Sequence, residues 1–108
     1  MKVSVIIPTY KRADFLKGCL ESLWQQKRKP DEIVLVIRPE DKTSLEIIRS
    51  FEARVKDAFQ MKTATIEKPG VVFAENEGLR HASGEILCFI DDDATARPDW
   101  IQRIESHF

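Results

Sequence analysis

Hydrophobic and polar positions along the chain follow two alternating periods, and each period predicts a different kind of element. Short runs rich in valine and isoleucine are typical of strands buried in a sheet. Runs of this kind predict four strands, over residues 3–7, 33–37, 63–66 and 85–90. The third run is the weakest of the four, and the pair Pro69 and Gly70 closes it.

Between the strands, apolar residues recur three and four positions apart, which is the spacing of a helix with one buried face. The first predicted helix carries Leu16, Cys19, Leu20, Leu23 and Trp24 on that face. The second carries Leu45, Ile48, Phe51 and Val55. Thr43 with Glu46 three residues later matches a capping box, which predicts where the second helix begins.

The last two helices are indicated by small residues and a proline. The third spans 71–83, and Gly84 predicts its end. Small residues recur every four positions along it, a pattern that lets the helix backbone lie close to a sheet; they are Ala74, Gly78 and Ala82. Pro98 suits the first turn of the fourth helix. The apolar face of that helix consists of Ile101, Ile104 and Phe108.

Strands that alternate with helices predict an α/β fold, here a Rossmann-like open parallel sheet of about four strands with helices on both faces. A length of 108 residues allows one compact core, so we expect a single domain over 1–108. Ligands of open parallel sheets bind outside the carboxyl ends of the strands, where the strand order reverses. The residues that directly follow each strand are therefore the candidates for function.

The composition excludes some classes of protein but does not indicate a particular function. Hydrophobic residues make up 43% and charged residues 32% of the chain, as in ordinary globular proteins. A formal net charge of -1 argues against a nucleic-acid partner. The longest apolar run, 86–90, is too short for a transmembrane segment, and the first residues show no signal peptide. We expect a location in the cytoplasm or at the cytoplasmic membrane surface, with Cys19 and Cys88 as buried reduced thiols.

The strongest candidate for chemistry is the acidic triplet Asp91, Asp92 and Asp93, which directly follows the most apolar strand. Adjacent carboxylates repel one another unless water or a cation takes up their charge. Hard cations such as Mg²⁺ or Mn²⁺ prefer oxygen ligands and keep positions for phosphate oxygens. As a bare tripeptide the triplet fits a solvated turn better than a metal site. Its position at the functional edge of a parallel sheet reverses that order.

Other nucleotide-binding signatures are missing from the sequence. No G-x-x-x-x-G-K-[ST] motif occurs, which excludes a P-loop, and no G-x-G-x-x-G motif follows the first strand. The residues that do follow the first strand are Pro8, Thr9 and Tyr10, and those after the second include Arg38 and Asp41.

Several segments together resemble family 2 glycosyltransferases of the GT-A fold. The likeness runs in order through VSVIIPTY (3–10), the segment 11–16, DEIV (31–34), NEGL (76–79), ASGE (82–85), FIDDD (89–93) and PDW (98–100). Each piece is short, but the ordered set covers essentially the whole chain. The resemblance implies the N-terminal, nucleotide-sugar-binding half of an enzyme that transfers a sugar from a nucleoside-diphosphate sugar to a glycan, lipid or protein acceptor.

The resemblance also implies roles for individual residues. Pro8, Thr9 and Tyr10 belong to the donor nucleotide pocket. Asp91 and Asp92 lie near the ribose and first phosphate. Asp93 is the best single ligand for Mn²⁺ or Mg²⁺, with Asp91 as the second metal candidate.

Three departures from the family pattern matter. The family usually places an aspartate right after the second strand to hold the base, whereas Ile37 and Arg38 stand here, so we expect Asp41 to serve. Glu75 stands where the family often has arginine. The acceptor half, with its general base, has no counterpart up to Phe108, so the catalytic residue is unknown and the chain is expected to be a truncated glycosyltransferase.

Two other classes stay open at this point. A nucleotidyltransferase also uses carboxylate-held Mg²⁺ on an α/β sheet, although it normally shows a glycine-rich loop after its first strand. A non-catalytic nucleotide-binding or interaction module is the other alternative. A sheet of four strands leaves an open edge, which predicts a homodimer, a missing second half or marginal stability.

Overall fold

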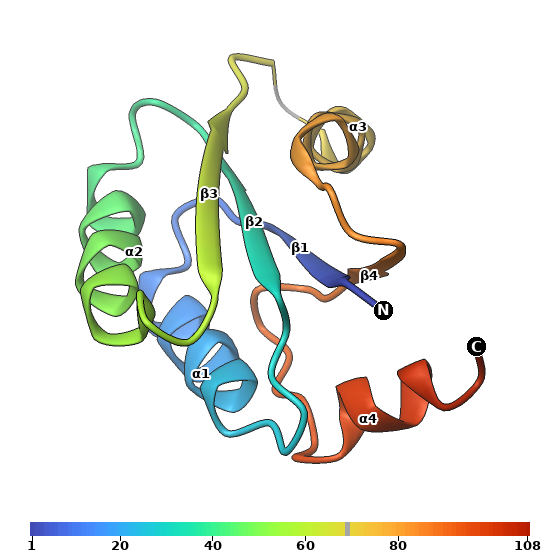
Figure 1. Ribbon diagram of the computed structural model, residues 1–108. Helices are drawn as coiled ribbons and strands as arrows, with labels where there is room; N and C mark the ends of the chain where they lie inside the picture. The colour runs from blue at the N-terminus through green and yellow to red at the C-terminus, as the bar shows by residue number, and fades with distance from the viewer. Residues whose placement is uncertain (69) are drawn as a thin grey trace.

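The computed structural model describes residues 1–68 and 70–108, in which strands and helices alternate along the chain (Figure 1). The strands are β1 (Val3–Pro8), β2 (Glu32–Ile37), β3 (Gln60–Thr65) and β4 (Ile86–Phe89). The helices are α1 (Ala13–Trp24), α2 (Lys42–Val55), α3 (Val71–His81) and α4 (Trp100–Glu105). All strand pairs are parallel, which confirms the predicted α/β fold.

The two central strands are buried on both faces because helices cover both sides of the sheet. Residues of β1 and β2 alternate between the faces. Val5 and Ile7 join the large core beneath α1 and α2, whereas Ile6 faces α3. Helices α1 and α2 lie on one side of the sheet and α3 lies on the other (Figure 1). The edge strand β4 is buried at alternate residues only, and in the edge strand β3 only Met61 and Ala64 are buried.

The order of strands in the sheet is β3-β2-β1-β4. The chain moves outward from β1 to β3 and then returns to place β4 on the other side of β1. The order therefore reverses between β1 and β4, which makes the crevice at their carboxyl ends the expected ligand position.

Gly78 sets how closely α3 approaches the sheet. A Cβ atom added there would lie 2.4 Å from Ile6 Cγ2 and 3.3 Å from Val36 Cγ2. The predicted close packing of this helix is therefore confirmed at Gly78 and at the buried Ala74, whereas Ala82 already lies beyond the helix end.

Several predicted boundaries were wrong for identifiable reasons. Helix α2 begins at Lys42 because the Asp41 carboxylate accepts the Ser44 N–H at 3.3 Å, so Thr43 lies inside the first turn and is not the cap. Helix α3 ends at His81, two residues before the predicted end at Ser83. Gly84 instead follows that helix end and packs on β1, where its N–H donates to Ser4 Oγ at 2.8 Å.

The other differences concern the strand ends and the last helix. Strand β3 begins at Gln60, three residues earlier than predicted, and β4 spans only Ile86–Phe89. Pro98 precedes the N-cap Asp99, and Phe108 is exposed. The predicted break at Pro69 lies outside the described residues. None of the helices in the described part of the chain has both the length and the apolar character needed to cross a bilayer.

Candidate functional site

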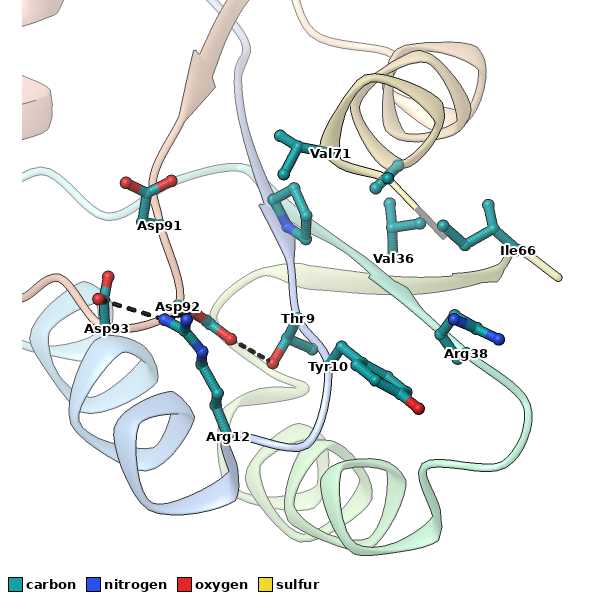
Figure 2. Close-up of a pocket in the computed structure, with 13 residues that line it drawn as sticks. Thr9, Tyr10, Arg12, Val36, Arg38, Ile66, Val71, Asp91, Asp92 and Asp93 are labelled. Carbon is teal, nitrogen blue, oxygen red and sulfur yellow. Dashed lines mark hydrogen bonds and ion pairs between the residues drawn. The ribbon is translucent and has the colours of Figure 1, made fainter. Parts of the chain in front are cut away.

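An open cleft of about 480 Å³ lies at the carboxyl ends of β1, β2 and β4, beside the start of α3. It brings together six of the residues selected from the sequence, which are Pro8, Thr9, Tyr10, Asp91, Asp92 and Asp93. The cleft is further lined by Arg38, which the sequence places directly after the second strand, and by Arg12, Val36, Ile66, Gly70, Val71 and Ala74. The acidic triplet and Arg38 stand toward opposite ends of this cleft, with Thr9 and Tyr10 between them (Figure 2).

Asp92 is the buried member of the triplet, with 6% of its surface exposed. Its Oδ2 accepts a hydrogen bond from Thr9 Oγ1 at 2.8 Å, and its Oδ1 lies 3.5 Å from Arg12 Nη1. Both carboxylate oxygens are therefore occupied by protein groups. Asp92 thus fixes the end of β4 to the turn after β1.

Asp91 and Asp93 are exposed on either side of Asp92. Asp93 Oδ2 accepts from Arg12 Nη1 at 3.3 Å, while about half of the Asp93 side chain stays open to solvent. In Figure 2 the Asp92 carboxylate points toward Thr9, and the carboxylates of Asp91 and Asp93 point elsewhere. These two side chains are the ones free to meet a ligand.

The donor set fits a divalent cation that shares its coordination with a ligand. Asp91 and Asp93 offer hard oxygen donors, whereas no group of three or more His, Cys, Asp or Glu residues in the described ranges is arranged to hold a metal alone. Mg²⁺ is usually held by one or two carboxylates together with substrate phosphates. The site therefore suits a metal carried with a phosphate group, and not a closed protein cage.

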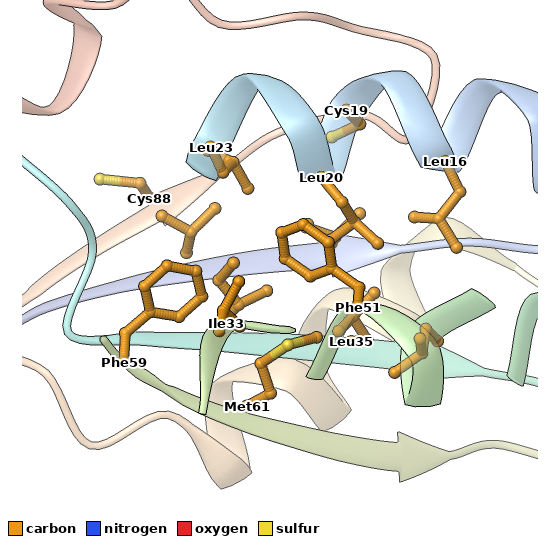
Figure 3. Packing of buried hydrophobic residues seen from close by; sticks show 14 of the residues in the cluster. Leu16, Cys19, Leu20, Leu23, Ile33, Leu35, Phe51, Phe59, Met61 and Cys88 are labelled. Atoms are coloured by element: carbon orange, nitrogen blue, oxygen red, sulfur yellow. The ribbon is translucent and has the colours of Figure 1, made fainter. Parts of the chain in front are cut away.

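Cys19 of α1 belongs to the main hydrophobic core between the sheet and helices α1 and α2 (Figure 3). Its Sγ lies 3.6 Å from the Asp91 carbonyl oxygen, to which it donates a weak hydrogen bond. Burial, and then the negative charges of Asp92, Asp91 and Asp93, raise the pKa of Cys19 to about 12. The thiol therefore stays protonated at neutral pH, and the predicted burial of both cysteines is confirmed.

The other end of the cleft is largely apolar and contains Arg38. Its walls include Val36, Ile66, Val71 and Ala74. The guanidinium carbon of Arg38 lies 5.0 Å from the centroid of the Tyr10 ring, a cation–π contact. One terminal nitrogen of Arg38 pairs with Glu40 at 3.0 Å. Arg38 was already a candidate because it directly follows β2, and Arg12 could have been noticed because it stands in the turn after β1.

Asp41 is not among the residues that line the cleft. One of its oxygens accepts from the Lys11 N–H at 2.7 Å, and the other caps α2 through Ser44. Burial alone raises the pKa of Asp41, but the hydrogen bonds from Lys11 and Ser44 outweigh it and leave the pKa lowered. Lys11 has a positive φ of 52°, so Asp41 stabilises the turn that presents Tyr10 and Arg12. We therefore do not assign contact with a nucleobase to it.

Comparison with known proteins places this geometry in a family. The model of glycosyl transferase family 2 matches residues 4–108. A glucosyl-dolichyl phosphate glucuronosyltransferase of Haloferax volcanii is 32% identical over 96% of this chain, which corresponds to 33% of that protein.

Solved structures agree with the sequence comparison. S. aureus TarS residues 1–349 in complex with UDP-GlcNAc align with a TM-score of 0.80 and 26% identity, over 98% of this chain and 30% of that chain. The mannosyltransferase PcManGT of Pyrobaculum calidifontis, in complex with GDP-Man and Mn²⁺, aligns with a TM-score of 0.78 and 29% identity, over 91% of this chain and 29% of that chain. The chain thus spans about a third of the length of these relatives. With the family model matching nearly the whole chain and the fold in agreement, the chain belongs to glycosyl transferase family 2.

Proposed function

We propose that residues 1–108 form a nucleotide-sugar-binding domain that holds a nucleoside-diphosphate sugar for transfer of the sugar to an acceptor. The observation that carries this proposal is the convergence of the turn after β1 and the acidic triplet after β4 on one cleft. Such a crevice at the reversal of strand order is where open parallel sheets bind ligands.

The two ends of the cleft suit the two ends of such a donor. The apolar end, with Tyr10 and Arg38, offers planar and apolar surfaces against which a nucleobase can pack. The opposite end, with Asp91 and Asp93, offers the oxygen ligands for a divalent cation. When bound there, Mn²⁺ or Mg²⁺ would neutralise the diphosphate and make it a better leaving group.

Arg12 has a second role in this proposal. Its guanidinium balances the charge of Asp92 and Asp93. A donor diphosphate arriving with its metal brings both a positive ion for Asp93 and negative oxygens for Arg12. The side chain is half exposed and can turn from the carboxylates toward a phosphate.

The proposal for these residues covers donor binding. Transfer requires an acceptor, which we place among glycans, lipids or proteins, and a general base that removes a proton from the acceptor hydroxyl. We assign no residue of 1–108 to that base. One solved relative is in complex with UDP-GlcNAc and another with GDP-Man and Mn²⁺, which supports a nucleoside-diphosphate sugar as the donor class here.

Calorimetric titration of UDP and GDP into the chain, with and without Mn²⁺, tests the proposal. We expect metal-dependent binding of at least one nucleotide, and a loss of roughly tenfold in affinity in Asp93→Ala, on the order of the cost of one charge-assisted contact. Asp57→Ala removes an exposed carboxylate outside the cleft and should bind as the parent does. A chain that melts cooperatively and binds neither nucleotide under either condition contradicts the proposal.

A further inference from the structure

An irregular segment, residues 94–99, connects the acidic triplet to α4. Backbone polar groups outside helices and strands have to find hydrogen-bond partners elsewhere in the protein. Here those partners come from the last part of α1 and from the turn that follows it. The Ser22 hydroxyl accepts the Ala96 N–H at 2.9 Å. The Lys27 N–H donates to the Pro98 carbonyl oxygen at 2.8 Å. The segment is therefore held against α1.

Gln26, just after α1, binds this segment with both polar atoms of its side-chain amide. Its Nε2 donates to the Arg97 carbonyl oxygen at 2.6 Å and to the Ser22 carbonyl oxygen at 3.2 Å. Its Oε1 accepts the Ile101 N–H at 3.0 Å. The residue is only 1% exposed, and both donor hydrogens of the amide are used. The buried amide therefore fixes the backbone at positions 97 and 101 relative to the end of α1.

Asp93 lies between two attachments of the backbone. Before it, Asp92 is bonded to Thr9 at 2.8 Å. After it, Ala96 is bonded to Ser22. The Asp93 side chain is itself 47% exposed, so packing does little to hold it in place. The position of its carboxylate therefore depends on how firmly the backbone is held on either side.

We propose that Gln26 and Ser22 are positioning residues of the donor site, which place the Asp93 carboxylate for a metal carried with a diphosphate. This inference rests on the proposed function, because it requires Asp93 to meet such a metal. Both side chains lie outside the set of described residues that line the cleft, so they act through the backbone and not by touching the donor. Loss of groups that orient a metal ligand typically lowers metal affinity by about 10- to 100-fold.

The test is calorimetric titration of UDP and GDP into this chain, once in excess Mn²⁺ and once in excess EDTA. The ratio of the two affinities measures what the metal contributes. Gln26→Met keeps the length of the side chain and removes the amide. We expect the ratio to fall by about tenfold in this variant, mainly through weaker binding in Mn²⁺. Circular dichroism sets a temperature at which every variant is folded.

Ser22→Ala and Ser4→Ala form a matched pair that separates positioning from stability. Each serine hydroxyl donates one hydrogen bond and accepts one from a backbone N–H. Ser4 lies near the start of β1, whereas the cleft lies at the carboxyl end of that strand. We expect both variants to unfold more easily than the parent, but only Ser22→Ala to lower the ratio. Ser22→Ala also carries the test by itself if Gln26→Met does not fold.

The other outcomes separate this inference from the proposed function. If the parent shows metal-dependent binding and the ratio is unchanged in Gln26→Met and Ser22→Ala, the positioning role is overturned and donor binding stands. An equal fall of the ratio in Ser4→Ala assigns the effect to general loss of stability and also overturns the role. A folded parent that binds neither nucleotide overturns both the inference and the proposed function.

Discussion

Thr9 and Asp92 stand 83 positions apart in the sequence and are joined by a hydrogen bond of 2.8 Å. The bond connects the turn after β1 to the segment after β4, across the place where the strand order reverses. It also buries one carboxylate of the triplet. The three aspartates therefore differ in role: Asp92 connects the two sides of the cleft, and we propose that the exposed Asp91 and Asp93 contact the ligand.

Thr9→Val tests this bond, because valine keeps the shape of threonine and removes the hydroxyl donor. The buried Asp92 oxygen loses its partner, so we expect the free energy of unfolding to fall by about 1 to 3 kcal/mol. Nucleotide affinity should fall as well, since the two halves of the cleft are no longer fixed. Urea denaturation and calorimetry measure the two effects. Thr95→Val, at an exposed position, should change neither the free energy of unfolding nor the nucleotide affinity. If Thr95→Val lowered both as much as Thr9→Val does, the effect could not be assigned to the bond between Thr9 and Asp92.

Arg12 competes with a metal for the same carboxylates. Its Nη1 lies 3.3 Å from Asp93 Oδ2, so Arg12→Gln should leave the Asp93 carboxylate more attractive to a cation. We expect Mn²⁺ without nucleotide to bind several-fold tighter, corresponding to about 1 kcal/mol for a half-exposed ion pair. Titration followed by Mn²⁺ paramagnetic resonance measures this. Arg103→Gln breaks an exposed pair with Asp99 elsewhere and serves as the control. An unchanged or weaker Mn²⁺ affinity in Arg12→Gln contradicts the competition.

Gly78→Ala and Gly18→Ala form a matched pair that tests the packing of α3. Alanine normally favours a helix over glycine by about 1 kcal/mol. At Gly18 the added methyl meets only Thr95 Cγ2 at 3.8 Å, so we expect a small gain in stability. At Gly78 it would overlap Ile6 Cγ2, so α3 must move off the sheet at a cost of about 1 to 3 kcal/mol. Thermal unfolding of both variants measures the change in stability. An increase in stability in Gly78→Ala would show that α3 does not pack closely against the sheet at this position.

We predict that the chain self-associates through the edge strand β4. Leu87 and Phe89 are 42% and 41% exposed on a strand that pairs with β1 alone within the described residues. An exposed apolar strand edge is a template for pairing with another copy. Sedimentation velocity should show association that Leu87→Lys reduces, whereas Phe15→Lys, an exposed apolar position on α1, should not reduce it. A monodisperse monomer at high concentration would speak against this edge as an interface.

The fold could be predicted from the sequence because its strands and helices have different periods. The β-branched runs of β1 and β2 and the apolar face of α1 were found in nearly their observed positions. Strand β3 was placed three residues late because only Met61 and Ala64 of this edge strand are buried, which leaves almost no pattern to read. The start of α2 was misplaced because Asp41 and Thr43 are both acceptable caps, and only the backbone decides between them.

The position of the candidate site could be predicted from the sequence, but the roles of its individual residues could not. The position of the triplet after a buried strand indicated the functional edge of the sheet, yet three adjacent aspartates look alike in sequence. Burial of Asp92 against Thr9 is a tertiary contact, so no spacing rule reveals it. Asp41 was selected as a ligand contact because it is an acid near the edge, whereas its oxygens serve Lys11 and Ser44. Family membership, and not these residues alone, decides against a nucleotidyltransferase.

Glu32 forms a buried charged network at the opposite end of the sheet from the cleft. Its carboxylate accepts from Ser83 N–H at 2.6 Å and Ser4 Oγ at 2.7 Å, and it lies 3.0 Å from Lys62 Nζ. Burial alone raises the pKa of Glu32, but these hydrogen bonds outweigh it and lower the pKa to about 2. The network ties β1, β2 and β3 to the connection that leads into β4.

This lowered pKa predicts a specific loss of stability in acid. Because the folded state holds the Glu32 proton more weakly than the unfolded state, its contribution is present above the unfolded value of 4.5 and is lost as the pH falls toward 2. We expect the parent to exceed Glu32→Gln by about 2 kcal/mol near pH 6, less than the full linkage value because Lys62 is partly exposed. The difference should shrink steadily between pH 4.5 and pH 2. Urea unfolding across this range measures it, with Glu52→Gln as an exposed control that should follow the parent throughout. A difference that stays constant with pH would mean that Glu32 stabilises the fold through its shape and neutral hydrogen bonds, and not through its charge.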